Sequence, residues 1–167
     1  WSHDDGIVVS GTVTVTGTGI LTIDHSTVSF LQCSGIKVMP GGKLNINSSA
    51  LKGCDHARWE GITVLGNPHS PQIAVDQGIG SVSGSTIEDA DIGILAGYHL
   101  GQTFDNSVAG GIINTSNNTV MQNNSIDIMF LPYGQFRSSS VIEQTTFGPL
   151  YPGNQDCAAG QTEETGC

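Results

Sequence analysis

The sequence has little charge, and little of that charge is positive. Charged residues make up 12% of the 167 residues, with 5 Lys and Arg against 15 Asp and Glu, for a net charge of −10. About a quarter of an ordinary globular chain is charged. A nucleic-acid partner requires a basic stripe that neutralises phosphates, and the scattered bases provide none. An anionic membrane surface is disfavoured for the same reason.

Long hydrophobic runs are also missing. No segment approaches the roughly 18 apolar residues of a membrane-spanning helix, so no membrane insertion is expected. No convincing amphipathic helix is present, and residues 1–5 do not form a signal peptide. We therefore expect an all-β chain that is a mature or excised portion of a longer protein.

Glycine and short runs of β-forming residues are abundant. The chain has 23 Gly residues, near twice the average use. The best-defined run is 58–67, where Ile62 and Val64 alternate with Thr63 between two turns. Related segments occur at 34–42, 91–97, 110–114 and 125–130. A repeated unit of one strand and one turn predicts a β-solenoid.

Two segments show the repeat most clearly. Residues 19–23 and 42–46 both read Gly-x-Leu-x-Ile and lead into a polar corner with Ser. A looser third copy is predicted at 72–75, followed by 84–90. A period of about 20–25 residues with three short strands per turn is typical of a parallel β-helix. A β-sandwich would explain the strand lengths but gives no reason for the repeat.

The polar corners and the alternation make two further predictions. We expect the corner side chains, including those of Gln122–Asn124, to bond the backbone and their equivalents in neighbouring coils. Period-two alternation predicts an inward-facing core. Its expected members are Val13, Val15, Leu21, Ile23, Val28, Phe30, Ile36, Val38, Leu44, Ile46, Leu51, Ile62, Val64, Ile73, Val75, Ile87, Ile92, Ile94, Ile112, Val120, Ile126 and Ile128.

The domain organisation is expected to be simple. We predict a single β-helix domain over residues 1–167, with coils over about residues 7–147 and a tail over about residues 148–167. Residues 97–109 are expected to leave the coil as an outward loop. The chain length suits one domain with a sizeable core.

The cysteines are expected to form disulfides. Cys157 and Cys167 bracket the polar tail, while Cys33 and Cys54 lie about one coil apart. No close pair of the kind that binds zinc occurs. Disulfides would close the tail and lock neighbouring coils, which implies a location outside the cytoplasm.

The order of these motifs carries a family resemblance. Trp59-Glu60-Gly61-Ile62-Thr63-Val64 is followed by Ser85-Thr86-Ile87-Glu88-Asp89-Ala90, and later by the Asn123-Asn124 corner. The pattern resembles the right-handed parallel β-helix repeat region of large secreted surface proteins of Bacteroidota-type bacteria. The resemblance covers about residues 15–147. It implies a fold and secretion to the cell surface or beyond, rather than an activity.

Candidate chemical groups are few. Glu88, Asp89 and Asp91 could supply oxygen ligands to Ca²⁺, or form a solvated turn. Trp59 could stack on a sugar ring, or pack at a coil corner. His56 with Glu60 could act as an acid–base pair, or lie on the rim as surface charges.

The aromatic residues of the expected outward loop and the lack of enzyme motifs also bear on the function that we expect. Tyr98 and His99 could form a binding lip, or anchor their loop. The motifs of pectin-type hydrolases are missing, so no catalytic residue is assigned and an enzyme is not expected. We expect a structural or adhesive module that contacts copies of itself or adjoining segments of a longer chain. A carbohydrate-binding or polysaccharide-degrading β-helix is the alternative.

Overall fold

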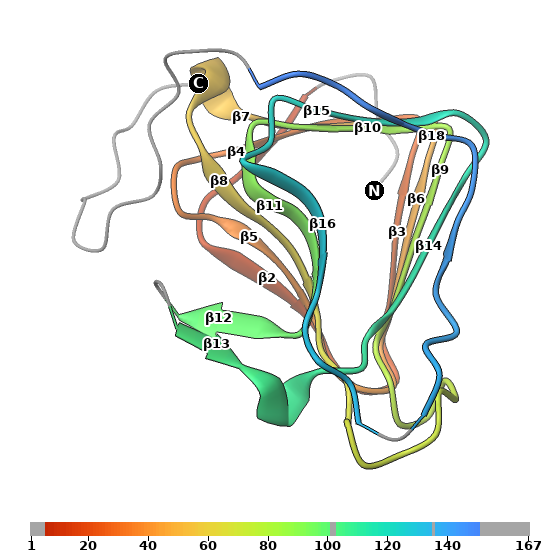
Figure 1. Cartoon of the computed structure of the whole chain (residues 1–167). Coiled ribbons are helices and arrows are strands. Elements are labelled where there is room, and N and C mark those ends of the chain that lie inside the picture. Colours follow the sequence, from red (N-terminus) through yellow and green to blue (C-terminus); the bar gives the residue numbers. More distant parts are fainter. Residues whose placement is uncertain (1–5, 101–102, 135, 151–167) are drawn as a thin grey trace.

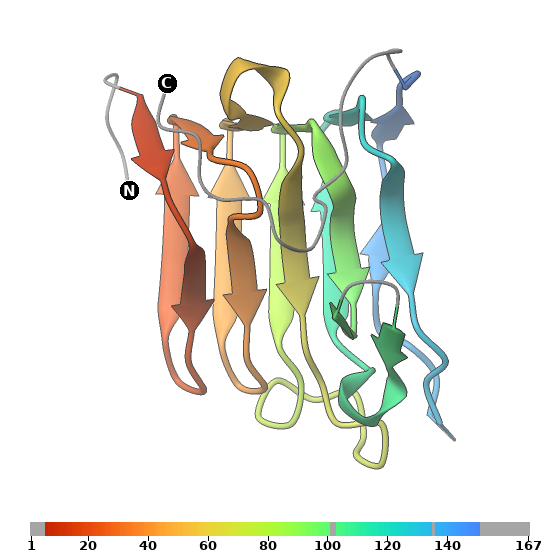
Figure 2. The same ribbon diagram turned by 90° about the vertical axis from the view of Figure 1, so that its left-hand side faces the viewer.

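The computed structural model describes residues 6–100, 103–134 and 136–150, which form a three-sided parallel β-solenoid (Figure 1). The chain visits three sheets in the same order in each coil. Figure 2 shows the coils side by side along the axis, from the first to the last. All neighbouring strands within these three sheets pair in parallel. The expectation of a β-helix-type solenoid is therefore confirmed, and the β-sandwich alternative is wrong.

We name the three sides sheets A, B and C. Sheet A contains β1 (Ile7–Val9), β4 (Thr27–Phe30), β7 (Ala50–Gly53), β10 (Thr86–Glu88), β15 (Thr119–Gln122) and β18 (Thr145–Phe147). Sheet B contains β2 (Thr12–Val15), β5 (Gly35–Val38), β8 (Trp59–Val64), β11 (Ala90–Ala96) and β16 (Ile126–Phe130). Sheet C contains β3 (Ile20–Asp24), β6 (Lys43–Asn47), β9 (Ile79–Ser83), β14 (Ile112–Ser116) and β17 (Val141–Ile142).

Alternation along each strand builds the core. In β6 the side chains of Leu44 and Ile46 are fully buried, while Lys43 and Asn45 are half-buried on the outer face. Leu21 lies beside Leu44 in the parallel register of β3 and β6. The Gly-x-Leu-x-Ile repeat therefore reflects the register of the strands, because equivalent residues of successive coils lie next to one another.

The widest fully buried side chains pack where sheet A meets sheet B, at the end of β4 and the start of β8. Trp59 and Phe30 are fully buried, and their rings stack at 4.1 Å between centroids with 11° between planes. The indole Nε1 of Trp59 donates a hydrogen bond of 2.8 Å to the carbonyl oxygen of Glu88. Its polar edge is therefore satisfied within the core.

A serine ladder forms the corner between sheets C and A. Ser26, Ser49 and Ser85 are buried at equivalent positions of successive coils. The backbone N–H of Ser26 donates to Oγ of Ser49 at 3.1 Å, and the N–H of Ser49 donates to Oγ of Ser85 at 3.0 Å. Each hydroxyl also donates to the carbonyl oxygen two residues earlier. The expectation that corner serines bond their equivalents is confirmed.

The corner between sheets A and B holds a buried polar cluster. Arg58, Asp89 and Asn123 are at most 3% exposed. Nδ2 of Asn123 donates to Oδ1 of Asp89 at 2.6 Å, and the guanidinium of Arg58 donates to the carbonyl oxygens of Ala90 and Asn123. Asp89 and Asn123 both adopt positive φ, which Asp and Asn tolerate better than most residues. The expected polar corner around Asn123 is therefore confirmed.

The corner between sheets B and C carries the long insertions. After β8, β11 and β16 the chain makes excursions over residues 65–78, 97–111 and 131–140. The second contains an antiparallel hairpin, β12 (Tyr98–Leu100) with β13 (Thr103–Asp105), and the 3₁₀ turn η2 (Asn106–Val108). The expected outward loop is thus confirmed. A second 3₁₀ turn, η1 (Cys54–His56), widens the corner between sheets A and B.

Some expected core residues lie elsewhere. Ile73 and Val75 are 49% and 72% exposed in the 65–78 excursion, so the third repeat copy is wrong there. The true copy is β9, where Gly80 and Val82 lie beside Leu44 and Ile46. Ile126 is 41% exposed. Two further predictions need refinement: Ile92 packs in a separate buried cluster with Leu95, Ala109 and Leu131, and Met121 rather than Val120 joins the main core.

Candidate functional site: an open end and a cleft beneath the hairpin

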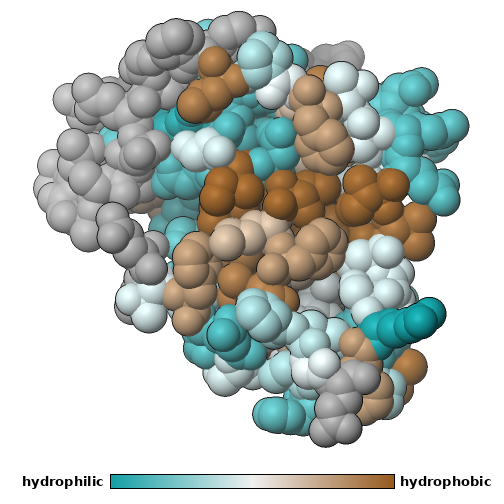
Figure 3. Space-filling view, viewed as in Figure 1, coloured by the Kyte–Doolittle hydropathy of each residue, from teal (hydrophilic) through white to brown (hydrophobic). Residues whose placement is uncertain are grey.

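The last coil exposes its apolar interior. Phe130 of β16 and Phe147 of β18 are 46% and 54% exposed, and Ile142 of β17 is 38% exposed. Their register partners Ala96, Met121 and Thr115 in the preceding coil are all buried. Brown side chains gather across the middle of this end of the molecule (Figure 3). We call this surface the open end.

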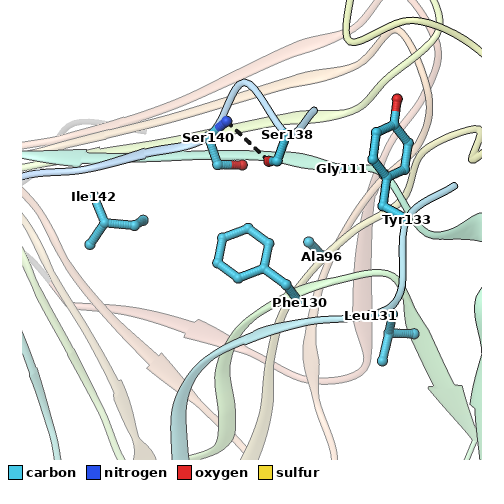
Figure 4. Close-up of a pocket in the computed structure, with 9 residues that line it drawn as sticks. Ala96, Gly111, Phe130, Leu131, Tyr133, Ser138, Ser140 and Ile142 are labelled. Atoms are coloured by element: carbon cyan, nitrogen blue, oxygen red, sulfur yellow. Dashed lines mark hydrogen bonds between the residues drawn. The ribbon is translucent and has the colours of Figure 1, made fainter. Parts of the chain in front are cut away.

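A pocket lies within the open end. It has a volume of about 280 Å³, and Figure 4 shows Phe130 and Ile142 approaching it from β16 and β17, with Ala96 and Gly111 from the preceding coil. Tyr133 lines one side, and its hydroxyl donates to the carbonyl oxygen of Ser70 at 2.6 Å. The pocket is mainly apolar and is the continuation of the solenoid core beyond the last complete coil.

The strand edges at both ends are unpaired within the described residues. β16, β17 and β18 are the last strands of their sheets at the open end, and β2, β3 and β1 are the last at the other end. Each edge presents backbone N–H and C=O groups that are able to pair with another strand.

A second site lies on the outer face of sheet B. The β12–β13 hairpin stands off the outer face of this sheet (Figure 1), and a cleft of about 150 Å³ lies between the hairpin and the sheet. Tyr98 and His99 form its hairpin side. The sheet side consists of Thr12, Ile36, Lys37, Glu60 and Thr63.

The electrostatics of this cleft come from two opposite charges. Nζ of Lys37 lies 4.2 Å from the ring centroid of Tyr98, a cation–π contact that fixes the hairpin against the sheet. Burial raises the pKa of the Glu60 carboxyl above its usual value, and Asp91 adds to this, while His99 and Lys37 act in the opposite direction. The carboxylate of Glu60 is therefore incompletely hydrated, which strengthens any hydrogen bond that it accepts.

The predicted aromatic residues divide between core and cleft. Trp59 as a sugar-stacking residue is wrong, because its ring is fully buried against Phe30. Tyr98 and His99 do line a cleft together, and the ring of His99 also contacts that of Phe104 at 6.1 Å between centroids. The binding-lip and anchoring interpretations of this loop are therefore both compatible with its geometry.

The predicted acidic site is dispersed. Glu88 accepts a hydrogen bond of 2.7 Å from Gln122 on sheet A, whereas Asp89 is buried in the corner cluster. Asp91 belongs to β11 of sheet B. Within residues 6–100, 103–134 and 136–150, no three His, Cys, Asp or Glu side chains are placed to hold a metal ion. The geometry thus gives no support to Ca²⁺ at these three residues.

The suggested acid–base pair is also separated. Nδ1 of His56 lies 3.4 Å from Oδ2 of Asp89, at the corner between sheets A and B, while Glu60 lines the cleft. Sequence reasoning did not identify Lys37 as a cleft residue. Its outward position in β5 was predictable from the alternation, but the return of the hairpin over β5 was not.

The disulfide expectation is wrong for Cys33, which carries a thiol. Cys33 and Cys54 do lie at the same corner of neighbouring coils, as expected, since Phe30 of β4 pairs beside Gly53 of β7. No disulfide joins two cysteines of the described part of the chain. Cys157, Cys167 and most of the predicted tail lie outside the described residues.

Two further findings bear on identity. No helix among the described residues is long and apolar enough to cross a membrane. Comparisons with protein-family models, curated proteins and solved structures returned no match. The three parallel sheets support the resemblance to β-helix repeat regions at the level of the fold, and the bacterial family assignment remains a prediction.

Proposed function

We propose that the chain is a structural module that associates end to end, the open end of one copy stacking on the first coil of the next. The observation that carries the proposal is the exposed interior of the last coil, at Phe130, Ile142 and Phe147. Large apolar side chains that face the axis of a solenoid are buried wherever another coil follows. Monomeric proteins rarely leave such a contiguous patch exposed without an interaction.

The geometry of the two ends favours a head-to-tail contact. Strands of one sheet all run in the same direction, so a second copy in the same orientation would extend sheets B and C in parallel, with its β2 paired with β16 and its β3 with β17. Sheet A has six strands and sheets B and C have five, so β18 would take the place of the second copy's β1 and pair with its β4. The same contact is already made at each step inside the molecule, for example between β2 and β5. A head-to-tail contact that does not close produces a filament.

The side chains of the first coil complement the open end. Ile7, Val13 and Leu21 pack against the core and are only partly buried. In the proposed stack, Val13 would cover Ile128, and Leu21 would approach the pocket between Phe130 and Ile142. Burial of apolar area contributes about 25 cal/mol per Å², so these contacts would drive association.

Charge opposes the stack. Each copy carries a net charge of −10, and copies of like charge repel one another over about 10 Å at moderate ionic strength. Association should therefore strengthen with added salt, which both screens this repulsion and leaves the apolar contact intact.

The proposal includes a location outside the cell or at its surface, and a right-handed coil as in the secreted surface proteins that the repeats resemble. The repetitive fold, the low charge and the abundance of small polar residues support it. Within such a protein the module would act as an extended spacer or adhesive element.

Sedimentation velocity over a wide concentration range, at low and high salt, tests the stacking. The wild type is expected to form particles of increasing mass, elongated in negative-stain images. Phe130→Asp and Phe147→Asp should shift it to a monomer. Val75→Asp is the matched control, because Val75 is 72% exposed in an excursion away from the strand edges. A wild type that stays monomeric at every concentration and salt would overturn the proposal.

A further inference from the structure

The cleft beneath the hairpin is built from parts of the chain that are distant in sequence. Thr12, Lys37 and Glu60 come from three successive coils of sheet B, and Tyr98 and His99 come from the excursion of the fourth. The Lys37–Tyr98 contact holds the hairpin against the sheet, and the pairing of His99 with Phe104 joins the two strands of the hairpin. The hairpin thus closes one side of a polar recess on an otherwise flat sheet.

The polar groups that line the recess can form hydrogen bonds with the hydroxyl groups of a ligand. Lys37 supplies N–H donors, Glu60 supplies carboxylate acceptors, and the hydroxyls of Thr12 and Thr63 serve as either. A sugar ring carries hydroxyls that each donate and accept, so it can satisfy both kinds of partner. The Tyr98 ring provides apolar surface for the C–H groups of such a ring.

The charges of the recess select against ionic ligands. Lys37 and Glu60 carry opposite charges. Asp91 lies near enough to Glu60 to raise the pKa of the Glu60 carboxyl. An anionic ligand would meet the Glu60 carboxylate, and a cationic ligand would meet Lys37. The balance favours a neutral ligand that exchanges hydrogen bonds with both charges.

The size of the recess limits what enters it. About 150 Å³ corresponds to the volume of roughly five waters in the liquid. This accommodates one ring and leaves the rest of a longer glycan outside. We propose that the cleft beneath the hairpin binds a single neutral sugar unit, at the end or side of a glycan, through Lys37, Glu60 and the face of Tyr98.

NMR titration of the isotope-labelled full chain provides the test. The probes are the methyl glycosides of glucose, galactose, mannose and xylose, with glucuronate and glucosamine as charged comparators. At least one neutral glycoside is expected to shift the amide signals of residues 37, 60 and 98 with saturation. Both charged sugars are expected to bind at least tenfold more weakly.

Variants separate the cleft from general surface effects. Lys37→Met and Tyr98→Ala are each expected to weaken the binding at least tenfold. Lys52→Met is the matched control, because Lys52 projects from β7 of sheet A, away from the cleft, and is half-buried in the same way. Its binding should equal that of the wild type.

Three results would overturn the inference: no saturable shift with any neutral glycoside, equal or tighter binding of glucuronate, or equal losses in Lys37→Met and Lys52→Met. The inference is independent of end-to-end stacking. Phe130→Asp should bind the sugar normally even though it cannot stack.

Discussion

The serine ladder permits a quantitative prediction about stability. In Ser49→Ala the backbone N–H of Ser26 loses its acceptor at 3.1 Å, and the carbonyl oxygen of Asn47 loses a donor at 2.7 Å. Ser26 is 4% exposed, so water has little access to the orphaned N–H. An unsatisfied buried polar group costs about 1–3 kcal/mol. We expect Ser49→Ala to lower the free energy of unfolding by about 2 kcal/mol.

Urea denaturation followed by circular dichroism measures this loss, with the m-value as a check that the same surface unfolds. Ser81→Ala is the matched control, since Ser81 lies half-buried on the outer face of β9, away from the corner. Its effect should remain within about 0.5 kcal/mol. Equal, small losses in both variants would refute the reasoning that the ladder hydroxyls are needed by the backbone.

Three further predictions concern single side chains. Trp59→Ala should cost about 3–5 kcal/mol in urea denaturation, because it leaves a cavity beside Phe30. Gly61→Ala should greatly reduce the yield of folded protein in expression trials, because Gly61 has a φ of +90° and a Cβ there would lie 1.8 Å from the carbonyl oxygen of Ile92. Glu60→Gln should raise the melting temperature at pH 7, since the raised pKa of Glu60 means that its ionisation disfavours the folded state. This gain should vanish at acidic pH below the ordinary Glu pKa of about 4.3, where the carboxyl is protonated in both states.

Each of these predictions has a contrary outcome. A folded Trp59→Ala protein of wild-type stability would mean that the stacked pair contributes little to the core. Normal yield of Gly61→Ala would show that β8 and β11 can separate without cost. A Glu60→Gln advantage that persists unchanged at acidic pH would show that the carboxyl charge is not its cause.

The sequence predicted the coil well where every coil obeys the same local rule. The corner at Ser26, Ser49 and Ser85 was predictable because each serine lies in a short polar segment between two runs of β-forming residues. The structure adds that the residue before each serine has a positive φ. The true third copy was missed because its inward positions begin with Gly80, which carries no hydrophobic signal. The run Ile73-Ala74-Val75 looked more like a strand, yet nothing in the solenoid covers it.

The candidate sites were less predictable, because each depends on contacts between distant segments. Trp59 looked suited to a ligand, but its neighbour Phe30 lies one coil earlier and occupies its ring face. Lys37 and Tyr98 meet only because the hairpin returns toward an earlier coil. No local pattern encodes that return.

The placement of the excursions has a consequence for engineering. Two edges of the prism have short turns held by the serine ladder and by the Arg58–Asp89–Asn123 cluster, whereas segments 65–78, 97–111 and 131–140 all leave from the third. Foreign peptides inserted at this edge would extend into solvent in a row, with a spacing set by the 4.7–4.9 Å distance between strands. The solenoid could therefore serve as a scaffold that displays epitopes at fixed intervals along one line.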